Sequence, residues 1–172
     1  MPVQIQTRYD QKALTAMARG LRKTVRRKHS RRSHVFGWLV LVLALVLGLA
    51  PLFQEPPEVN GLTLAVAAVL LAVLLFEDAV NGFFARRKLM PGTEESTTTF
   101  TGEHYITRTR AGETIWPYEN IQAIAEGERY LVLALSWRHA QAFDKQGLTQ
   151  GSLEELRTLL QERTGLPIVN IR

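Results

Sequence analysis

Two adjacent carboxylates, Glu77 and Asp78, stand out among the residues that could carry chemistry, because they directly follow a long apolar run. Ionisable groups at the end of such a run are costly to bury and often mark a functional site. They could equally reach interfacial water or pair with basic residues before the first apolar run, namely Arg27, Lys28, Arg31 or Arg32. We favour this second role, because the two apolar runs contain no other ionisable group and form no transport pathway on their own.

The remaining residue types favour neither a metal site nor catalysis. The chain has no cysteine, which excludes a disulfide, a thiolate nucleophile and a cysteine-based metal centre. We expect His29 and His34 to face solvent or lipid headgroups, and His104 and His139 to lie at strand edges. No phosphate-binding loop, nucleophile elbow or Ser/His/Asp order is present. We therefore expect no catalytic residue, no metal, no cofactor and no enzymatic activity.

A dense basic run stands immediately before the first apolar segment. Residues 1–34 contain ten Lys or Arg against Asp10 alone, a formal charge of +9, whereas the whole chain carries +5. A nucleic-acid arm is disfavoured, because the run lacks interleaved aromatic residues and a groove-reading module. We expect the run to set topology and to bind anionic lipid headgroups through Arg19, Arg22, Lys23, Arg26, Arg27, Lys28, Arg31 and Arg32.

Two apolar segments predict a transmembrane hairpin with spans at about residues 35–53 and 60–80. The first contains nineteen residues without a charge, close to the ~20 that cross a bilayer. A Pro- and Asn-Gly-containing turn, residues 54–61, separates it from residues 62–76, and the second helix should continue to Phe84. A buried helix of a soluble protein is the alternative. A cleaved signal peptide does not fit, because 34 residues are too long for its basic region.

The distribution of Lys and Arg predicts the orientation of the hairpin. Ten basic residues precede the first span, Arg86, Arg87 and Lys88 follow the second, and the loop between the spans has none. By the positive-inside rule, both termini should be cytoplasmic.

The basic run itself is expected to be helical. Leu14, Met17, Ala18, Leu21 and Val25 recur at helical spacing and form one apolar stripe. This stripe could lie on the inner leaflet, pack on a soluble domain or continue into the first span. The sequence does not choose among these three arrangements.

The last part of the chain predicts a small sheet closed by one helix. Ser152 and Glu155 form a capping box, and Gly165 should end the helix. The tail 168–172 could add a short strand, and residues 3–9 alternate as a seventh strand would. The six strands predicted before the helix lie near residues 96–101, 105–109, 114–116, 120–125, 129–136 and 140–143, and the apolar "YLVLAL" should be central.

This order of elements, together with "TTTFTGEHYITRTRAGETIWPYENIQAI" and "AFDKQGLTQGSLEELRTLLQE", resembles the YcxB-like family of bacterial membrane proteins. The resemblance implies a PH-like cytoplasmic domain, a bent seven-stranded sheet capped by a C-terminal helix, with no established activity. It also implies a multi-pass protein of the bacterial plasma (inner) membrane.

The combined expectation is an α+β protein in three parts. Residues 1–34 hold a strand and the basic helix, residues 35–90 the transmembrane hairpin, and residues 91–172 the PH-like domain. The expected function is a non-enzymatic inner-membrane protein that presents an interaction domain at the cytoplasmic face. The alternative is a membrane-anchored regulator or accessory subunit that binds through its hairpin. Expected partners are anionic lipids and an unknown protein, with self-association as one option, and no nucleic acid.

Overall fold

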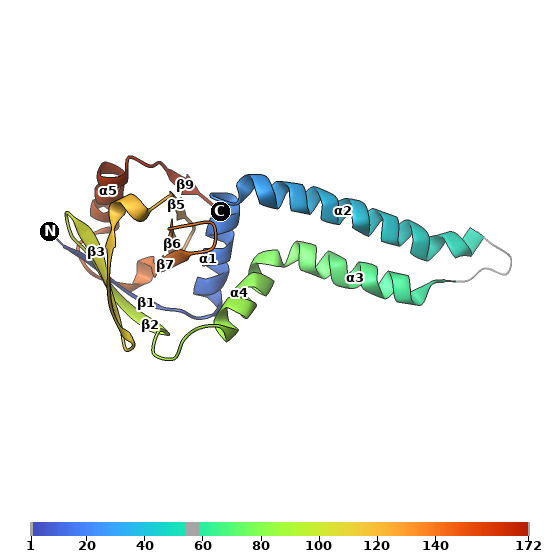
Figure 1. Cartoon of the computed structure of the whole chain (residues 1–172), viewed down its shortest axis with the longest axis horizontal. Coiled ribbons are helices and arrows are strands. Elements are labelled where there is room, and N and C mark those ends of the chain that lie inside the picture. Colours follow the sequence, from blue (N-terminus) through green and yellow to red (C-terminus); the bar gives the residue numbers. More distant parts are fainter. Residues whose placement is uncertain (1, 54–58, 172) are drawn as a thin grey trace.

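The computed structural model of the protein describes residues 2–53 and 59–171. A two-sheet part carries a long helical hairpin that projects from one side (Figure 1). The elements are β1 (Val3–Arg8), α1 (Gln11–Lys23), α2 (Arg27–Leu49), η1 (Ala50–Phe53), α3 (Gly61–Leu75), α4 (Glu77–Arg87), β2 (Glu95–Phe100), β3 (His104–Thr109), β4 (Gly112–Pro117), η2 (Tyr118–Asn120), β5 (Ala123–Glu126), β6 (Tyr130–Ala134), β7 (Ala140–Asp144), η3 (Lys145–Gly147), β8 (Leu148–Gln150), α5 (Leu153–Thr164) and β9 (Ile168–Asn170).

The first sheet has the strand order β4-β3-β2-β1-β8. β1 runs antiparallel to β2 along its whole length, from Val3 opposite Phe100 to Arg8 opposite Glu95. Alternate residues of β1 are buried, as its period-two pattern predicts. The prediction that the N-terminal strand completes the sheet is therefore confirmed. Since β1 and β2 are neighbours, everything between them is an insertion into one fold.

The second sheet has the order β7-β6-β5-β9. Every residue of β6 is buried, because the strand is covered on both faces. Leu131 and Leu133 join the core between the sheets, whereas Tyr130 and Val132 pack toward α1. The prediction that this apolar strand is central is confirmed.

The main core lies between the two sheets and is closed by α5. Helix α5 begins at the predicted capping box of Ser152 and Glu155 and ends at Gly165, whose φ of 65° places it in the left-handed region. The fully or nearly fully buried side chains of this core are Val3, Ile5, Phe100, Tyr105, Tyr118, Ile121, Ile124, Leu131, Leu133, Phe143, Leu156 and Leu160.

Helix α1 covers the other face of the second sheet. Met17 of the predicted apolar stripe packs there together with Ala13 and Ala16, and Leu14 and Leu21 are buried as well, which selects packing on the domain from the three arrangements left open. Gly20 lies against Val132 of β6, and a Cβ at this position would stand 2.7 Å from its Cγ1 atom. The helix ends at Lys23, so α1 does not continue into α2.

Helices α2 and α3 run side by side as the two arms of the hairpin (Figure 1). Glycines in α2 receive leucines from α3: a Cβ on Gly37 would lie 2.6 Å from Leu74, and one on Gly48 would lie 2.5 Å from Leu64. Asn60 caps α3 by accepting a hydrogen bond from the backbone of Thr63 at 3.1 Å. Most of the predicted turn at residues 54–61 lies outside the described residues.

One helical stretch in the described part of the chain, Arg27–Phe53, is long and apolar enough to cross a membrane. Helices α3 and α4 meet this criterion only as a pair, and they are bent by 81° at their junction. The second helix, predicted to continue to Phe84, is broken at Phe76: α3 ends at Leu75, and α4, which is helical to Arg87, turns aside to pack on α1. The contacts that draw α4 toward α1 are given below.

The coarse prediction of a mixed α+β fold is confirmed. The structure has two sheets where the resemblance implied a single bent one, with β8 and β9 as short additional strands. The predicted strand near residues 120–125 begins only at Ala123, because Tyr118–Asn120 forms a short 3-10 helix.

Candidate functional site

Five ionisable side chains meet where the hairpin joins the two-sheet part, and we name them the junction cluster: Arg19, Arg22, His34, Glu77 and Asp78. Arg22 donates two hydrogen bonds to Asp78, from Nε to Oδ1 at 2.7 Å and from the guanidinium to Oδ2 at 2.6 Å. Arg19 lies 3.5 Å from the same carboxylate. Glu77 is bonded to His34 of α2 and lies 3.8 Å from Arg22. The cluster thus connects α1, α2 and α4.

The Arg22–Asp78 pair is largely shielded from water. The Asp78 side chain is 10% exposed and that of Arg22 is 25% exposed. The hydrogen bonds to Asp78 raise the pKa of Arg22 above its ordinary value, although burial opposes the shift. A bidentate guanidinium–carboxylate pair fixes both side chains in direction as well as in distance. It therefore holds the first turn of α4 against the end of α1.

Close backbone packing completes the contact between α1 and α4. Gly82 faces Thr15, and a Cβ at this position would lie 2.8 Å from the Thr15 backbone nitrogen. The Gln11 amide also donates a 3.0 Å hydrogen bond to the carbonyl of Ala79. These contacts and the ion pair explain why the chain bends after Leu75 rather than continuing straight.

The ion-pair partners predicted for Glu77 and Asp78 differ from those in the structure. Neither Glu77 nor Asp78 pairs with Arg27, Lys28, Arg31 or Arg32, and these four form no ion pair within residues 2–53 and 59–171. Asp78 does not reach interfacial water either, because α1 covers it. His34, expected to face solvent or headgroups, is instead half-buried against Glu77. The predicted pairing with these four residues was wrong because the bend after Leu75 brings both carboxylates close to Arg22 of α1.

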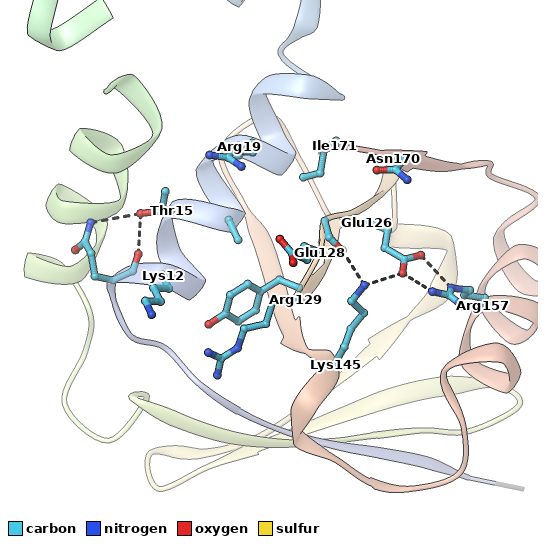
Figure 2. Close-up of a pocket in the computed structure, with 14 residues that line it drawn as sticks. Lys12, Thr15, Arg19, Glu126, Glu128, Arg129, Lys145, Arg157, Asn170 and Ile171 are labelled. Carbon is cyan, nitrogen blue, oxygen red and sulfur yellow. Dashed lines mark hydrogen bonds and ion pairs between the residues drawn. The ribbon is translucent and has the colours of Figure 1, made fainter. Parts of the chain in front are cut away.

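A concave region lies beside α1, between this helix and the turn that joins β5 to β6 (Figure 2). This pocket of about 860 Å³ is bounded by α1, the turn between β5 and β6, and residues from η3, α5 and the end of β9. We name it the α1 pocket. Its charged lining residues are Lys12, Arg19, Glu126, Glu128, Arg129, Lys145 and Arg157.

Glu126 is the central carboxylate of the α1 pocket. Its Oε1 accepts a 3.0 Å hydrogen bond from Lys145, and its Oε2 accepts a 3.0 Å bond from Nε of Arg157 (Figure 2). Hydrogen bonds from Arg157, and then those from Lys145, lower the pKa of Glu126, while partial burial opposes the shift. Glu126 is therefore a carboxylate held ionised between two cations.

The pocket can bind charged or polar groups by ion pairing. Lys12 is exposed and forms no ion pair within the described residues, whereas Arg129 is held by Asp144 at 2.6 Å. In the part of the chain that the structure describes, no three His, Asp or Glu side chains gather so as to hold a metal ion. Sequence reasoning missed Glu126, Lys145 and Arg157. The only local signal was their place in or beside polar turns, which many surface residues share.

Five of the six remaining members of the basic run are exposed. Lys23, Arg27, Lys28, Arg31 and Arg32 face outward from the end of α1 and the first turns of α2. Arg26 is half-buried and donates a hydrogen bond to the carbonyl of Trp137. The eight predicted lipid-binding residues thus divide in two. Arg19 and Arg22 belong to the junction cluster, Arg26 contacts the turn between β6 and β7, and the other five form no ion pair within the described residues.

The order of strands and the closing helix α5 can now be compared with known families. Residues 100–160 match the family model described as YcxB-like protein. The match begins at the last residue of β2 and ends within α5, so it covers β3 to β8 and the first two turns of the closing helix. The predicted resemblance to the YcxB-like family, whose function is unknown, is therefore confirmed over this segment. No curated protein matches the chain.

Proposed function

We propose that this chain is a non-enzymatic protein of the bacterial plasma membrane, anchored by the α2–α3 hairpin and presenting its YcxB-like segment at the cytoplasmic face as an interaction module. The observation that carries the proposal is the apolar surface of the hairpin. Only 11% of the most apolar window of α2 is buried. A water-facing surface of this composition is unfavourable, whereas a lipid-facing one is not.

The large apolar side chains exposed on the two arms and the adjoining 3-10 helix are Val35, Phe36, Trp38, Leu39, Val40, Val42, Leu43, Leu45, Val46, Leu47, Leu49, Leu52, Phe53, Leu62, Val66, Val69, Leu71, Val73 and Leu75. They lie on all sides of the hairpin except the seam between its arms. A docking site for one protein partner would leave an apolar stripe on one face, whereas lipid contact accounts for apolar residues on every outer face.

Chain topology supports two crossings rather than one. Arg8 and Glu95 are paired neighbours in the first sheet, so the chain leaves and re-enters the two-sheet part at the same place. If α2 crosses the bilayer, α3 must return through it for β2 to meet β1. Helix α3 alone has 15 residues, about 22 Å, against a hydrocarbon core of ~30 Å. The bilayer would have to thin locally around this shorter arm.

The proposed orientation rests on the exposed basic residues. Lys23, Arg27, Lys28, Arg31 and Arg32 surround the start of α2, and Arg86, Arg87 and Lys88 follow the second arm. Positive residues are retained on the cytoplasmic side and attract anionic headgroups by about 1 kcal/mol each. Both termini would then be cytoplasmic.

The interaction module is proposed to have a PH-like arrangement. Two packed sheets closed by the single helix α5 support this likeness. The non-enzymatic part is supported by Glu126, the central carboxylate of the α1 pocket, which is already bonded to two cations and is poorly suited to act as a base.

The alternative, an accessory subunit that binds through its hairpin, finds less support. Small residues in α2 could admit a partner helix, but Gly37 and Gly48 already receive Leu74 and Leu64 of the same hairpin. The glycines therefore serve packing within the chain.

Reporter fusions test the proposal. Fusions at Gln6, Glu55 and Arg172 should report the cytoplasm, the periplasm and the cytoplasm, and the full chain should remain in the membrane pellet after alkaline extraction. Release into the soluble fraction would disprove the anchoring, and a periplasmic C-terminus would disprove the orientation.

A further inference from the structure

The turn between β6 and β7 presents an unusual side chain to solvent. Trp137 is 52% exposed, and the other large apolar side chains exposed in the described parts of residues 2–34 and 91–171 are Ile115 and Val169. The turn is well ordered by its own hydrogen bonds, because Ser136 Oγ accepts from the backbone of Arg138 at 3.2 Å and of His139 at 3.1 Å. The indole is therefore held outward by a fixed turn.

Two guanidinium groups lie over the indole of Trp137. The Cζ atom of Arg138 is 4.4 Å from the ring centroid, and that of Arg26 is 5.6 Å away. Both distances are within the ~6 Å range of a cation–π contact. Arg26 also donates a hydrogen bond to the Trp137 carbonyl, which ties the turn to the linker that begins α2. The result is a cationic, aromatic surface, which we name the Trp137 turn.

The position of the Trp137 turn relative to the hairpin follows from helix geometry. Eight residues, Arg27 to His34, separate Arg26 from Val35, the first residue of the apolar run of α2, and the nine steps give a rise of about 13.5 Å. A headgroup layer is roughly 5–7 Å thick, so the turn would lie within about one Debye length of it. Transmembrane helices tilt by about 20° on average, and a tilt toward the turn would close this gap.

Charge indicates what the surface would meet. The chain has no Asp or Glu from residue 11 to residue 54, nor from residue 131 to residue 143, so both segments that build the surface lack carboxylates. A tryptophan flanked by arginines suits the interface of an anionic membrane, where the ring enters the headgroup layer and the cations pair with phosphates.

We propose that the Trp137 turn is a second membrane contact, which docks on anionic phospholipid headgroups and fixes the tilt of the two-sheet part against the bilayer. The contact rests on the proposed function, because it requires α2 to span the membrane beside it. It differs from the basic run of α2 in coming from the YcxB-like segment, more than 100 residues later in the chain. Docking would orient the α1 pocket and α5 relative to the membrane.

Tryptophan fluorescence of the full chain in vesicles tests this contact. Variant W38F/W116F retains only Trp137, and it is reconstituted into phosphatidylcholine vesicles with or without phosphatidylglycerol. We expect Trp137 emission to shift to the blue and to be quenched by shallowly brominated lipid in anionic vesicles only. Added salt should reverse both effects. R138Q should weaken the association about fivefold, as expected for losing one basic residue near an anionic surface.

The matched control moves the tryptophan to the other end of the fold. Ile115 is 59% exposed on β4, which pairs with β3 at the end of the two-sheet part away from the hairpin (Figure 1). I115W in a W38F/W116F/W137F background should show no lipid dependence. If W116F disturbs the core, comparing W38F with W38F/W137F isolates the same signal by difference.

Three outcomes would overturn the inference: Trp137 unaffected by anionic lipid, Trp137 quenched equally in neutral vesicles, or I115W quenched as strongly as Trp137. Trp38, near the start of the apolar run of α2, provides the separate test of anchoring, since lipid brominated near the top of its acyl chains should quench it in W116F/W137F, in neutral and anionic vesicles alike. Quenching of Trp38 without quenching of Trp137 rejects only the second contact. Absence of both rejects the proposed function itself.

Discussion

Leu133 on β6 and Leu43 on α2 are the same side chain in opposite surroundings: the first is 0% exposed and the second is 57% exposed. This contrast holds for the two regions as wholes. The two-sheet part gathers its apolar residues between the sheets and under α1, whereas the hairpin directs most of its apolar residues outward. The two-sheet part therefore gains stability by excluding water, at about 25 cal/mol per Å² of apolar surface. The hairpin obtains that gain only when another apolar phase surrounds it.

The two regions also differ in how they use charge. In the two-sheet part, ion pairs lie around the α1 pocket, for example Glu126 with Lys145 at 3.0 Å, and leave neighbouring cations accessible. At the base of the hairpin, the Arg22–Asp78 pair is enclosed between helices. Charged side chains therefore line a potential binding region in the α1 pocket, whereas the Arg22–Asp78 pair fixes the direction of α4.

Removing β1 would test the independence of the two regions most severely. Deletion of residues 2–8 should abolish the cooperative unfolding of the two-sheet part, because β2 and β8 lose their shared neighbour and Val3 and Ile5 leave the core. Hydrogen exchange should then show unprotected amides in β2 to β8, while the hairpin remains resistant to alkaline extraction. The control Q4A/Q6A changes the outer face of the same strand and should alter stability by only about 0.5 kcal/mol. Native-like protection after the deletion would contradict the role of β1.

Breaking the junction cluster should have the next largest effect. Asp78→Ala leaves Arg22 largely buried without its carboxylate, and we expect a loss of about 3 kcal/mol in the free energy of unfolding measured in detergent micelles. Glu113→Ala removes the exposed pair with Arg108 and should cost less than about 1 kcal/mol. Equal losses in the two variants would show that enclosure of the Arg22–Asp78 pair adds nothing to its contribution to the free energy of unfolding.

A substitution within the hairpin should disturb the hairpin and leave the two-sheet part unchanged. Gly48→Val places side-chain atoms where Leu64 packs and should separate the arms, at a cost of about 1–3 kcal/mol. Spin-label distances between Leu45 and Val66 should lengthen and broaden, with no change in the melting of the two-sheet part. Gly61→Ala is the matched control, because a Cβ there meets nothing within 4 Å. Unchanged distances in Gly48→Val would show that the arms do not need this contact.

The smallest expected effect is a pH dependence confined to the two-sheet part. Since Arg157 and Lys145 hold the pKa of Glu126 below its usual 4.5, the folded state binds this proton less readily than the unfolded state. The stabilisation is therefore present above about pH 4.5 and is lost as pH falls through the lowered pKa. Denaturant unfolding from pH 6 to pH 3 should show a shallower acid loss in Glu126→Gln than in wild type.

Glu128→Gln is the control for this pH dependence, because Glu128 lines the same pocket and forms no ion pair among the described residues. The free energy of unfolding of this variant should fall between pH 6 and pH 3 as that of wild type does. A Glu126→Gln variant that also follows wild type would assign the acid loss to other carboxylates.

The features that could be predicted from sequence were those with local or strictly periodic signals. The capping box of Ser152 and Glu155, the alternation in residues 3–8 and the doubly apolar β6 each reflect a rule that acts within a few residues. These three signals correctly predicted α5, the N-terminal strand of the first sheet and an inner strand of the second.

The features that sequence reasoning missed depend on residues far apart in the chain. The Arg22–Asp78 pair joins positions 56 residues apart, and the bend after Leu75 follows from it together with the close approach of Gly82 to Thr15. Glu126, Lys145 and Arg157 come from three separate elements, β5, η3 and α5, and meet only through the tertiary fold. Hydropathy alone continues the second helix in a straight line, because it contains no information about a partner helix.

The pairing of β1 with both β2 and β8 has a consequence for biosynthesis. Gln4 meets Thr99 on one side and Gln150 on the other. At about 5–20 residues per second, the ribosome needs roughly 7–30 seconds to make the second partner after the first strand has emerged. If the hairpin enters a membrane as proposed, the nascent strand must stay soluble during that interval, and Gln4, Gln6 and Arg8 keep its outer face polar. The return of α3 then delivers β2 to the point where β1 began, so insertion of the hairpin would itself start the folding of the domain.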